Sequence, residues 1–348
     1  MLLVLILAGV LFTVGWVFGV PLKARLIFLG ALWAAMVAVH LALPDGHPFR
    51  QGTGGDARPW LLLAILALAV WAYRTILQAL RRRARQHEAR TMPEVKKPLF
   101  SEAELNRYAR HLMLREVGGP GQRKLKEAKV LVIGAGGLGS PVLLYLAAAG
   151  VGTIGVIDDD AVESSNLQRQ IIHSDLTVGM PKVFSAQEQM EALNPFITVK
   201  PYHRRLTEAE AETLFAEYDL ILDGTDNFDT RYMANRVAVK TGKPLIAAAI
   251  TQWEGQIALY NPARGGPCFE CVFPTRPAPG LVPSCAEAGV IAPLPGVMGS
   301  MMAMEAVKLL TGAGAPLRGA MLIYDGLYAE TRRITIKPRP DCPVCHEA

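Results

Sequence analysis

The sequence predicts an α/β protein in which apolar helices precede a doubly wound, mostly parallel sheet with an antiparallel extension. An apolar run from Val130 to Ile133 breaks into a glycine cluster, and a helix-forming run follows to Ala149. Strand and helix patterns then alternate up to Ala249, which is typical of βα units and parallel sheets. In the first third of the chain, three long runs carry almost no charge. Together these patterns favour a Rossmann-like domain that follows a membrane region.

The N-terminal region, residues 1–80, contains the three apolar runs, which cover residues 2–20, 26–43 and 60–80. A helix of about 20 apolar residues matches the roughly 30 Å hydrocarbon core of a bilayer. The third run includes Arg74, whose side chain can reach the interface because it lies near the end of the run. A cleaved signal peptide is the alternative for the first run, but no basic residue precedes that run.

Charge is distributed unevenly and predicts a topology. Residues 1–97 hold 12 Lys and Arg against 4 Asp and Glu, whereas residues 98–348 hold 24 against 27. The basic residues lie between the first two runs and in a linker over residues 81–99, and basic loops favour the cytoplasm. We therefore expect a multi-pass protein of the inner (cytoplasmic) membrane, with its N-terminus outside and its C-terminal domain, residues 100–348, in the cytoplasm. The slightly acidic domain predicts no nucleic-acid partner.

The C-terminal domain is expected to open with a helix over residues 101–114, because Ser101 and Glu104 have capping-box spacing. The glycines of residues 118–122 are expected to end that helix. Expected parallel strands cover residues 129–134, 153–157, 197–201, 220–223 and 244–249. Expected helices between them cover residues 141–149, 182–193, 207–217 and 229–241. Expected strands of the extension cover residues 256–260, 322–325 and 330–337. A methionine-rich helix over residues 298–310 is expected to pack in the core or at a dimer interface.

The glycine cluster matches the pattern G-x-G-x-x-G at Gly134, Gly136 and Gly139, with Gly137 also inside it. Such glycines let the backbone approach a phosphate group at a helix N-terminus, where N–H groups favour anions. Asp158 ends the second expected strand, 19 residues beyond Gly139, where a carboxylate can bind a ribose hydroxyl. The motif alone fits a dinucleotide as well as ATP.

The five cysteines predict a metal site. Four of them form two C-x-x-C pairs, Cys268 with Cys271 and Cys342 with Cys345. In a reducing compartment this spacing favours a tetrahedral, structural Zn²⁺ site with no open position for catalysis. Two unconnected pairs of buried thiols are the alternative. Cys285 is left over.

A set of motifs across residues 101–346 resembles the MoeB/ThiF/HesA family, the bacterial relatives of ubiquitin-activating enzymes, and within it the molybdopterin-synthase adenylyltransferases. No single motif is specific, but the set is. It consists of Arg107-Tyr-Ala-Arg110, Gly134-x-Gly-Gly-Leu-Gly139, Asp158-x-Asp160, Asn166-Leu-Gln-Arg169, Lys182, Asp223-x-Thr-Asp226-Asn227, the two C-x-x-C pairs and Cys285-Ala-Glu-Ala-Gly-Val.

The resemblance implies a reaction and its ligands. A small ubiquitin-like sulfur-carrier protein would be adenylated at its C-terminal glycine, with ATP and Mg²⁺, in molybdenum cofactor biosynthesis. The family also implies a homodimer. The same reaction on the thiamin-pathway carrier is the nearest alternative. A nicotinamide-dependent oxidoreductase would share the glycine turn but would not need cations around a triphosphate, and a catalytically inactive membrane scaffold would need none of the charged residues.

The resemblance also implies roles for individual residues. Asp158 would hold the ribose, and Asn166, Arg169 and Lys182 would contact phosphates. Asp226 would bind Mg²⁺, although a turn-capping role is the alternative. The nucleotide site would also include Asp160 and Asn227. Arg110 would reach the nucleotide of the partner subunit, the alternative being an exposed helix charge. Cys285 would lie on a loop over the active site and take part in thiol chemistry, or it is a structural cysteine.

Overall fold

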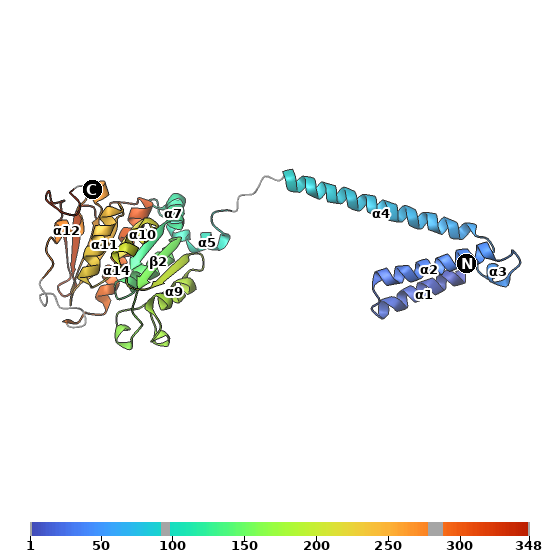
Figure 1. The fold of residues 1–348 in the computed structure, drawn as a ribbon, viewed down its shortest axis with the longest axis horizontal. Coiled ribbons are helices and arrows are strands. Elements are labelled where there is room, and N and C mark those ends of the chain that lie inside the picture. Colours follow the sequence, from blue (N-terminus) through green and yellow to red (C-terminus); the bar gives the residue numbers. More distant parts are fainter. Residues whose placement is uncertain (1, 92–97, 278–287, 347–348) are drawn as a thin grey trace. The chain divides into compact units, whose positions relative to one another are not determined.

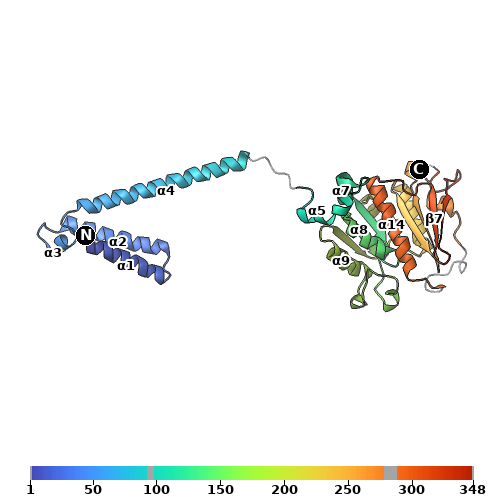
Figure 2. The same ribbon diagram turned by 180° about the vertical axis from the view of Figure 1, so that it is seen from behind.

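The computed structural model describes residues 2–91, 98–277 and 288–346. The chain divides into two compact units, Met1–Lys97 and Pro98–Ala348, which are described separately (Figures 1 and 2). In its described part the first unit is helical, and the second is built around one 8-stranded sheet.

The described part of the N-terminal unit contains α1 (Leu2–Val17), α2 (Leu22–Ala42), α3 (Pro48–Gly52) and α4 (Arg58–Thr91). By length and composition, α2 and residues 58–83 of α4 could cross a membrane, whereas the apolar stretch of α1 is shorter. The expected first span over residues 2–20 is therefore too long, because the chain turns at Gly19 with φ +73°. The expected linker over residues 81–99 is also wrong in part. Its Arg, Ala, Gln and Glu residues favour helix, and α4 continues to Thr91.

A buried tryptophan fixes the connection between α2 and α4. The Trp60 side chain is almost fully buried, and its indole N–H donates to the Thr53 carbonyl at 3.3 Å. The Trp33 indole of α2 donates to the Trp60 carbonyl at 2.9 Å. His40, also buried, lies 3.1 Å from the Thr53 hydroxyl. These hydrogen bonds satisfy polar groups that would otherwise be buried unpaired at the end of two apolar helices.

The sheet of the C-terminal unit has the strand order β3-β2-β1-β4-β5-β6-β7-β8. Strands β1 to β5 are parallel, and β6, β7 and β8 are antiparallel to their neighbours, as the sequence predicts. The chain order reverses between β1 and β4, and in such sheets ligands bind at the carboxyl ends of the two strands that flank this switch point. The strands are β1 (Lys129–Ile133), β2 (Thr153–Asp158), β3 (Thr198–His203), β4 (Leu220–Asp223), β5 (Leu245–Ile250), β6 (Glu254–Tyr260), β7 (Ala320–Asp325) and β8 (Glu330–Thr335).

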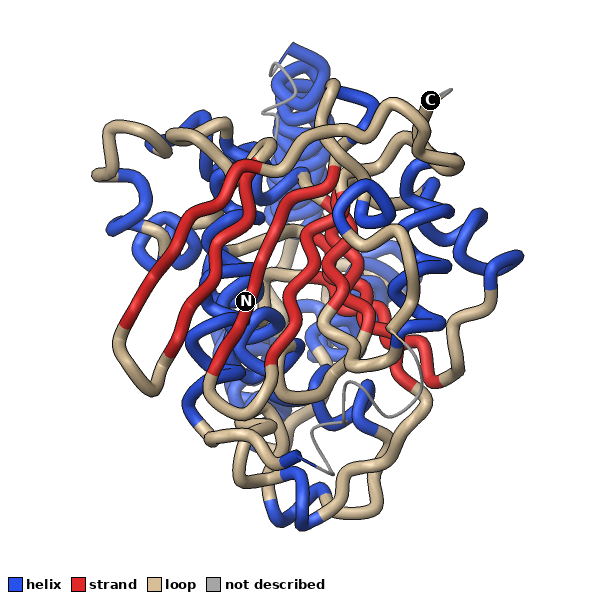
Figure 3. Tube along the Cα trace, turned by 90° about the vertical axis from the view of Figure 1, so that its left-hand side faces the viewer, coloured by secondary structure: helices blue, strands red, loops and turns tan. Residues whose placement is uncertain are grey.

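Helices lie on both faces of the twisted sheet (Figure 3). The described helices are α5 (Glu102–Arg107), α6 (Ala109–Leu112), α7 (Gly118–Glu127), α8 (Gly139–Ala149), α9 (Lys182–Leu193), α10 (Glu208–Ala216), α11 (Phe228–Lys240), α12 (Phe269–Val272) and α14 (Pro293–Thr311), with short 3-10 turns at η1 (Ser164–Asn166), η2 (Asp175–Thr177) and η3 (Pro262–Arg264). In β1, Val130 and Val132 pack with α8, α9 and α14, whereas Leu131 and Ile133 pack with α10 and α11. Alternate residues of a strand point to opposite faces, so both faces of β1 are buried.

The methionine-rich helix α14 packs in the core, as expected. Met298 and Met302 are fully buried in the cluster that also contains residues of α8. Gly255 of β6 makes room for the Met298 side chain, since a Cβ at Gly255 would lie 2.5 Å from Met298 Cγ. Met304 is on the opposite side of the helix and 62% exposed.

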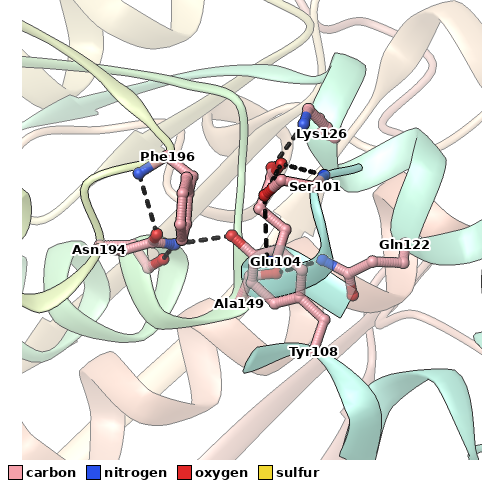
Figure 4. Close-up of polar contacts among 9 residues, drawn as sticks. Ser101, Glu104, Tyr108, Gln122, Lys126, Ala149, Asn194 and Phe196 are labelled. Carbon is pink, nitrogen blue, oxygen red and sulfur yellow. Dashed lines mark hydrogen bonds and ion pairs between the residues drawn. The ribbon is translucent and has the colours of Figure 1, made fainter. Parts of the chain in front are cut away.

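The first helices of the domain differ from the prediction. The expected helix over residues 101–114 is interrupted at Tyr108, whose side chain is buried, and the glycines of residues 118–122 start α7 instead of ending a helix. Asn194 donates to the Tyr108 hydroxyl at 2.9 Å and to the Ala147 carbonyl at 2.6 Å (Figure 4). The buried Gln122 amide donates to the Ala149 carbonyl at 2.8 Å. These bonds attach the segment to the ends of α8 and α9.

Candidate functional site

The glycine turn lies at the switch point, between the carboxyl ends of β1 and β4. Gly134 has φ +93°, a conformation that favours glycine. A Cβ at Gly139 would lie 2.0 Å from the Gly134 carbonyl oxygen, and a Cβ at Gly224 would lie 3.2 Å from the Gly139 nitrogen. The turn is therefore tight, and it packs directly on the loop that follows β4.

The turn presents backbone donors. The N–H groups of Gly136, Gly137 and Leu138 have no acceptor within the described part of the chain. Both glycines are partly exposed, and they lie just before α8, where the helix dipole adds positive character. This arrangement can bind a phosphate group.

Asp158 holds the turn at the end of β2. Its carboxylate accepts from the Ala135 N–H at 2.8 Å and from the Asp160 N–H at 2.8 Å. Burial raises the pKa of Asp158, and these two hydrogen bonds oppose that effect. A carboxylate has about four lone-pair sites, so it can still accept from a ribose hydroxyl.

Lys182 and Asp160 form an ion pair beside the turn. Lys182 Nζ lies 2.7 Å from Asp160 Oδ2, and its backbone N–H donates to the Asp160 carbonyl at 2.9 Å. Lys182 is the first residue of α9 and is only 5% exposed. Lys182 and Asp160, both predicted for the nucleotide site, therefore contact each other.

Asn166 is the last residue of η1, and Arg169 lies in the segment that follows it. The Arg169 guanidinium donates to the Ser165 carbonyl at 3.3 Å, and its Cγ lies 3.7 Å from where a Cβ of Gly137 would be. The structure thus brings Arg169 to the glycine turn. The Asn166 side chain accepts from the Glu163 N–H at 3.4 Å and is half-buried.

Asp223, Asp226 and Asn227, at the end of β4 and in the loop after it, have different environments. Asp223 is buried, and its Oδ1 accepts from the Thr225 N–H at 2.9 Å and from the Thr225 hydroxyl at 2.6 Å. Asp226 is exposed and makes no hydrogen bond within the described residues. Asn227 caps α11 by accepting from the Asp229 N–H at 2.8 Å. The cap is therefore Asn227, which leaves the Asp226 carboxylate available to a ligand.

Arg110 is placed apart from these contacts. It lies on the short helix α6, is exposed and forms no ion pair with the described residues. No hydrogen bond or ion pair among the described residues joins its side chain to the glycine turn.

Sequence reasoning missed two groups of residues beside the site. His173 and Ser185 are buried under the turn, and His173 Nε2 lies 2.9 Å from the Ala135 carbonyl oxygen. Arg231 of α11, also buried, donates to the Thr225 carbonyl and, at 2.6 Å, to the Ala248 carbonyl. These side chains bond to backbone groups that are far away in the sequence, so motif spacing alone could not identify them.

The four predicted cysteines form one cluster. Their sulfur atoms all lie within 4.8 Å of one another. Cys268 Sγ is 3.6 Å from Cys342 Sγ, and Cys271 Sγ is 3.4 Å from Cys345 Sγ. A tetrahedron with Zn–S bonds of about 2.3 Å has S–S edges of about 3.8 Å, so the cluster could hold zinc.

The surroundings of the cluster fit a buried structural ion. Cys268 and Cys342 are fully buried, and the Arg339 N–H donates to Cys271 Sγ at 3.3 Å. Burial raises the pKa of Cys268, and it raises the pKa of Cys345 to about 12. A metal ion would supply the charge that holds these sulfurs as thiolates. Cys285 lies outside the described residues.

Three comparisons identify the chain's relatives. The model of the ThiF family matches residues 108–344. The sulfur carrier protein adenylyltransferase of Thermus thermophilus is 50% identical over 250 residues, which cover 71% of this chain and 92% of the relative. The probable adenylyltransferase/sulfurtransferase MoeZ of Mycobacterium tuberculosis is 49% identical over 247 residues, which cover 70% of this chain and 63% of MoeZ.

A solved structure agrees with these sequence relatives. Escherichia coli MccB in complex with ATP aligns with a TM-score of 0.59 and 25% identity, over 74% of this chain and 83% of MccB. The family match spans the glycine turn, the predicted nucleotide residues and three of the four clustered cysteines, and it ends one residue before Cys345. The chain therefore belongs to the ThiF family.

Proposed function

We propose that this protein uses ATP to adenylate the C-terminal glycine of a ubiquitin-like sulfur-carrier protein, with the carrier of molybdenum cofactor biosynthesis as the first candidate and the thiamin-pathway carrier as the second. The observation that carries the proposal is the cluster at the switch point. There the glycine turn, Asp158, Lys182 and Arg169 lie around one set of free backbone donors. The name and the 50% identity of the Thermus relative support the same reaction.

In the proposed reaction, a carboxylate oxygen of the carrier attacks the α-phosphorus of ATP. A phosphorus–oxygen bond forms to the carrier, and the bond between the α-phosphorus and the bridging oxygen breaks, so that pyrophosphate leaves with both electrons of that bond. The products are an acyl-adenylate and pyrophosphate. Because the reacting groups are all anionic, catalysis needs positive charge and fixed positions more than proton transfer.

The residues of the site supply these requirements. The N–H groups of Gly136 and Gly137 would bind a phosphate, and Arg169 offers a planar fork for phosphate oxygens. Lys182 would bind as a point charge that Asp160 has already oriented. The exposed Asp226 carboxylate, a hard oxygen ligand, fits Mg²⁺, which would neutralise phosphate charge when bound.

A nicotinamide-dependent oxidoreductase is the second class considered. It would share the glycine turn and the ribose-binding Asp158, but hydride transfer gives no reason for Lys182 and Arg169 to lie beside the phosphate donors. The named activities of the relatives also favour adenylation.

The test is carrier-dependent exchange of pyrophosphate into ATP, with the full chain in detergent and each purified sulfur carrier in turn. We expect exchange with one carrier, and a loss of at least about 100-fold in Asp226→Ala and Arg169→Ala. Glu188→Ala and Arg205→Ala are matched controls, because both side chains are exposed and unpaired within the described residues. Near-normal exchange in both site variants would contradict the assignment.

We further propose a homodimer in which Arg110 acts on the nucleotide of the partner subunit. The exposure of Arg110 and its lack of an ion pair within the described residues support this role. Mixing the Arg110→Ala and Asp226→Ala proteins should then restore exchange, because each mixed dimer contains one intact site. No recovery after subunit exchange would rule out action across the interface.

We also propose that α2 and α4 hold the protein in the cytoplasmic membrane, with the C-terminal unit in the cytoplasm. Both helices are long and apolar enough to span, and basic residues lie at the start of α2 and after the apolar part of α4. Alkaline phosphatase fused after residue 97 should be inactive, and high activity there would contradict this topology.

We also propose that the thiol of Cys285 takes part in the activation of the carrier. The variant Cys285→Ala tests this role, because it should stop carrier activation without unfolding the protein.

A further inference from the structure

We propose that His173 is a positioning residue for ATP, which fixes the peptide group between Ala135 and Gly136 so that the Gly136 N–H points at the bound phosphate. This inference rests on the proposed function, because it assumes that a phosphate group binds at the glycine turn. His173 lies in the loop between η1 and η2, 38 residues beyond Ala135, and its side chain is buried.

The hydrogen bonds define the state of the His173 ring. A carbonyl oxygen can only accept, so the contact of 2.9 Å between Nε2 and the Ala135 oxygen requires a proton on Nε2. Burial lowers the pKa of His173. On the other side of the ring, Nδ1 lies 2.9 Å from the Ser185 hydroxyl oxygen, and that hydroxyl donates to the Thr177 hydroxyl at 3.0 Å. Ser185 thus contacts the far side of the ring and helps to hold its orientation.

The peptide geometry connects this contact to the ligand. In a trans peptide the C=O and the N–H point in opposite directions. Holding the Ala135 oxygen therefore aims the Gly136 N–H away from His173. That N–H has no acceptor within the described residues, and Gly136 is partly exposed. The preceding N–H, of Ala135, is already taken by Asp158 at 2.8 Å.

These contacts close a ring through the site. Ala135 bonds to Asp158, the Asp158 carboxylate accepts from the Asp160 N–H, and Asp160 pairs with Lys182. Lys182 begins α9, and one turn later Ser185 of the same helix bonds to His173, which returns to Ala135. The ring ties the backbone donors to the lysine that would bind another phosphate oxygen. A shift of either would move the other, so His173 would act on ATP without touching it.

The experiment measures ATP binding by isothermal titration and the KM and kcat for ATP in the exchange assay, with the full chain in detergent. His173→Leu removes the donor at similar volume, and we expect its ATP affinity to fall about 10- to 100-fold, as for the loss of one hydrogen bond to a charged group. KM should rise more than kcat falls. His173→Gln can place an N–H where Nε2 lies, so it should stay within about 3-fold of the wild type. Ser185→Ala should show a smaller loss than His173→Leu.

A control separates positioning from a general loss of stability. Tyr218→Phe removes the 3.0 Å hydrogen bond between the Tyr218 and Tyr202 hydroxyls, in the core cluster on the other face of the sheet. It should leave ATP affinity unchanged even if the protein unfolds at lower temperature. A folded His173→Leu variant with wild-type affinity, or a His173→Gln variant as weak as His173→Leu, would overturn the inference. Wild-type protein that binds ATP but exchanges with no carrier would refute the proposed reaction alone, whereas wild-type protein that binds no ATP would refute both.

Discussion

Substitution by alanine should destabilise the protein at Gly139 but have little effect at Gly136, although both glycines belong to the same turn. A Cβ at Gly139 would lie 2.0 Å from the Gly134 carbonyl oxygen, and real Cβ contacts essentially never fall below 3.0 Å. In Gly139→Ala, the start of α8 and the Gly134 peptide must therefore move apart by about 1 Å, the difference between these distances. At Gly136 the nearest atom would be Gln170 Nε2 at 3.7 Å, which is an ordinary contact. The motif treats these glycines alike, whereas the packing does not.

The magnitude follows from the contact. Forcing one methyl group into a packed region costs about 1–3 kcal/mol, and alanine's preference for helix returns at most about 1 kcal/mol at Gly139, the first residue of α8. We expect a net loss of about 2 kcal/mol for Gly139→Ala. In a domain of this size that lowers the unfolding temperature by roughly 4–8 °C. Gly136→Ala should change it by no more than about 1–2 °C.

Calorimetry of the nucleotide-free protein is the suitable assay. Tryptophan fluorescence is less suitable, because four of the five tryptophans lie in the N-terminal unit and only Trp253 lies in the C-terminal unit. The comparison is made on the transition of the C-terminal unit, without ATP, so that ligand contacts cannot contribute. Equal unfolding temperatures for the two variants would refute the steric reasoning, and so would a larger loss in Gly136→Ala.

Two further predictions concern the cysteine cluster and the helix α5. Cys342→Ser should lose bound zinc and unfold at lower temperature, whereas Cys285→Ser should retain one zinc ion per chain by mass spectrometry of the metal; zinc-free wild-type protein would refute the site. Burial alone would raise the pKa of Glu104, but the Lys126 ion pair and the hydrogen bonds from Ser101 lower it below its ordinary value of 4.5. The stability that this carboxylate adds is therefore fully present above pH 4.5 and is lost as the pH falls through the lower folded-state pKa. The unfolding temperatures of the wild type and of Lys126→Met should therefore converge as the pH falls below 4.5. A constant difference between the two unfolding temperatures at every pH would show that the ion pair adds no pH dependence.

The sheet could be predicted because its signals are local. A short apolar run buried on both faces, followed by a glycine or carboxylate, marks the carboxyl end of a parallel strand, and β1, β2 and β4 all follow this pattern. The pairing of those ends then brings Asp158 and the glycine turn together through the fold's topology. Half of the site thus follows from strand ends alone.

The errors arose where tertiary packing overrides composition. Residues 118–122 read as a loop because they contain three glycines and a proline, yet they form the first turns of α7. Proline is tolerated in the first turn of a helix. Gly121 is needed there, since a Cβ would lie 2.9 Å from Val117 Cγ1 and 3.5 Å from the Thr311 side chain of α14. The close approach of the Val117 side chain therefore explains the glycine at this position.

The charge arrangement indicates how the site would receive a triphosphate. Lys182 is buried and compensated by Asp160, whereas Arg169 has no carboxylate partner within the described residues and donates only to the Ser165 carbonyl. An ammonium group has three donors, and Asp160 takes one of those on Lys182. A phosphate can therefore bind Lys182 without breaking the ion pair, and Arg169 is the cation whose charge it would newly neutralise. Arg169 should accordingly dominate the electrostatic attraction of ATP, and the ring through Asp160, Lys182 and His173 should set the geometry in which ATP is held.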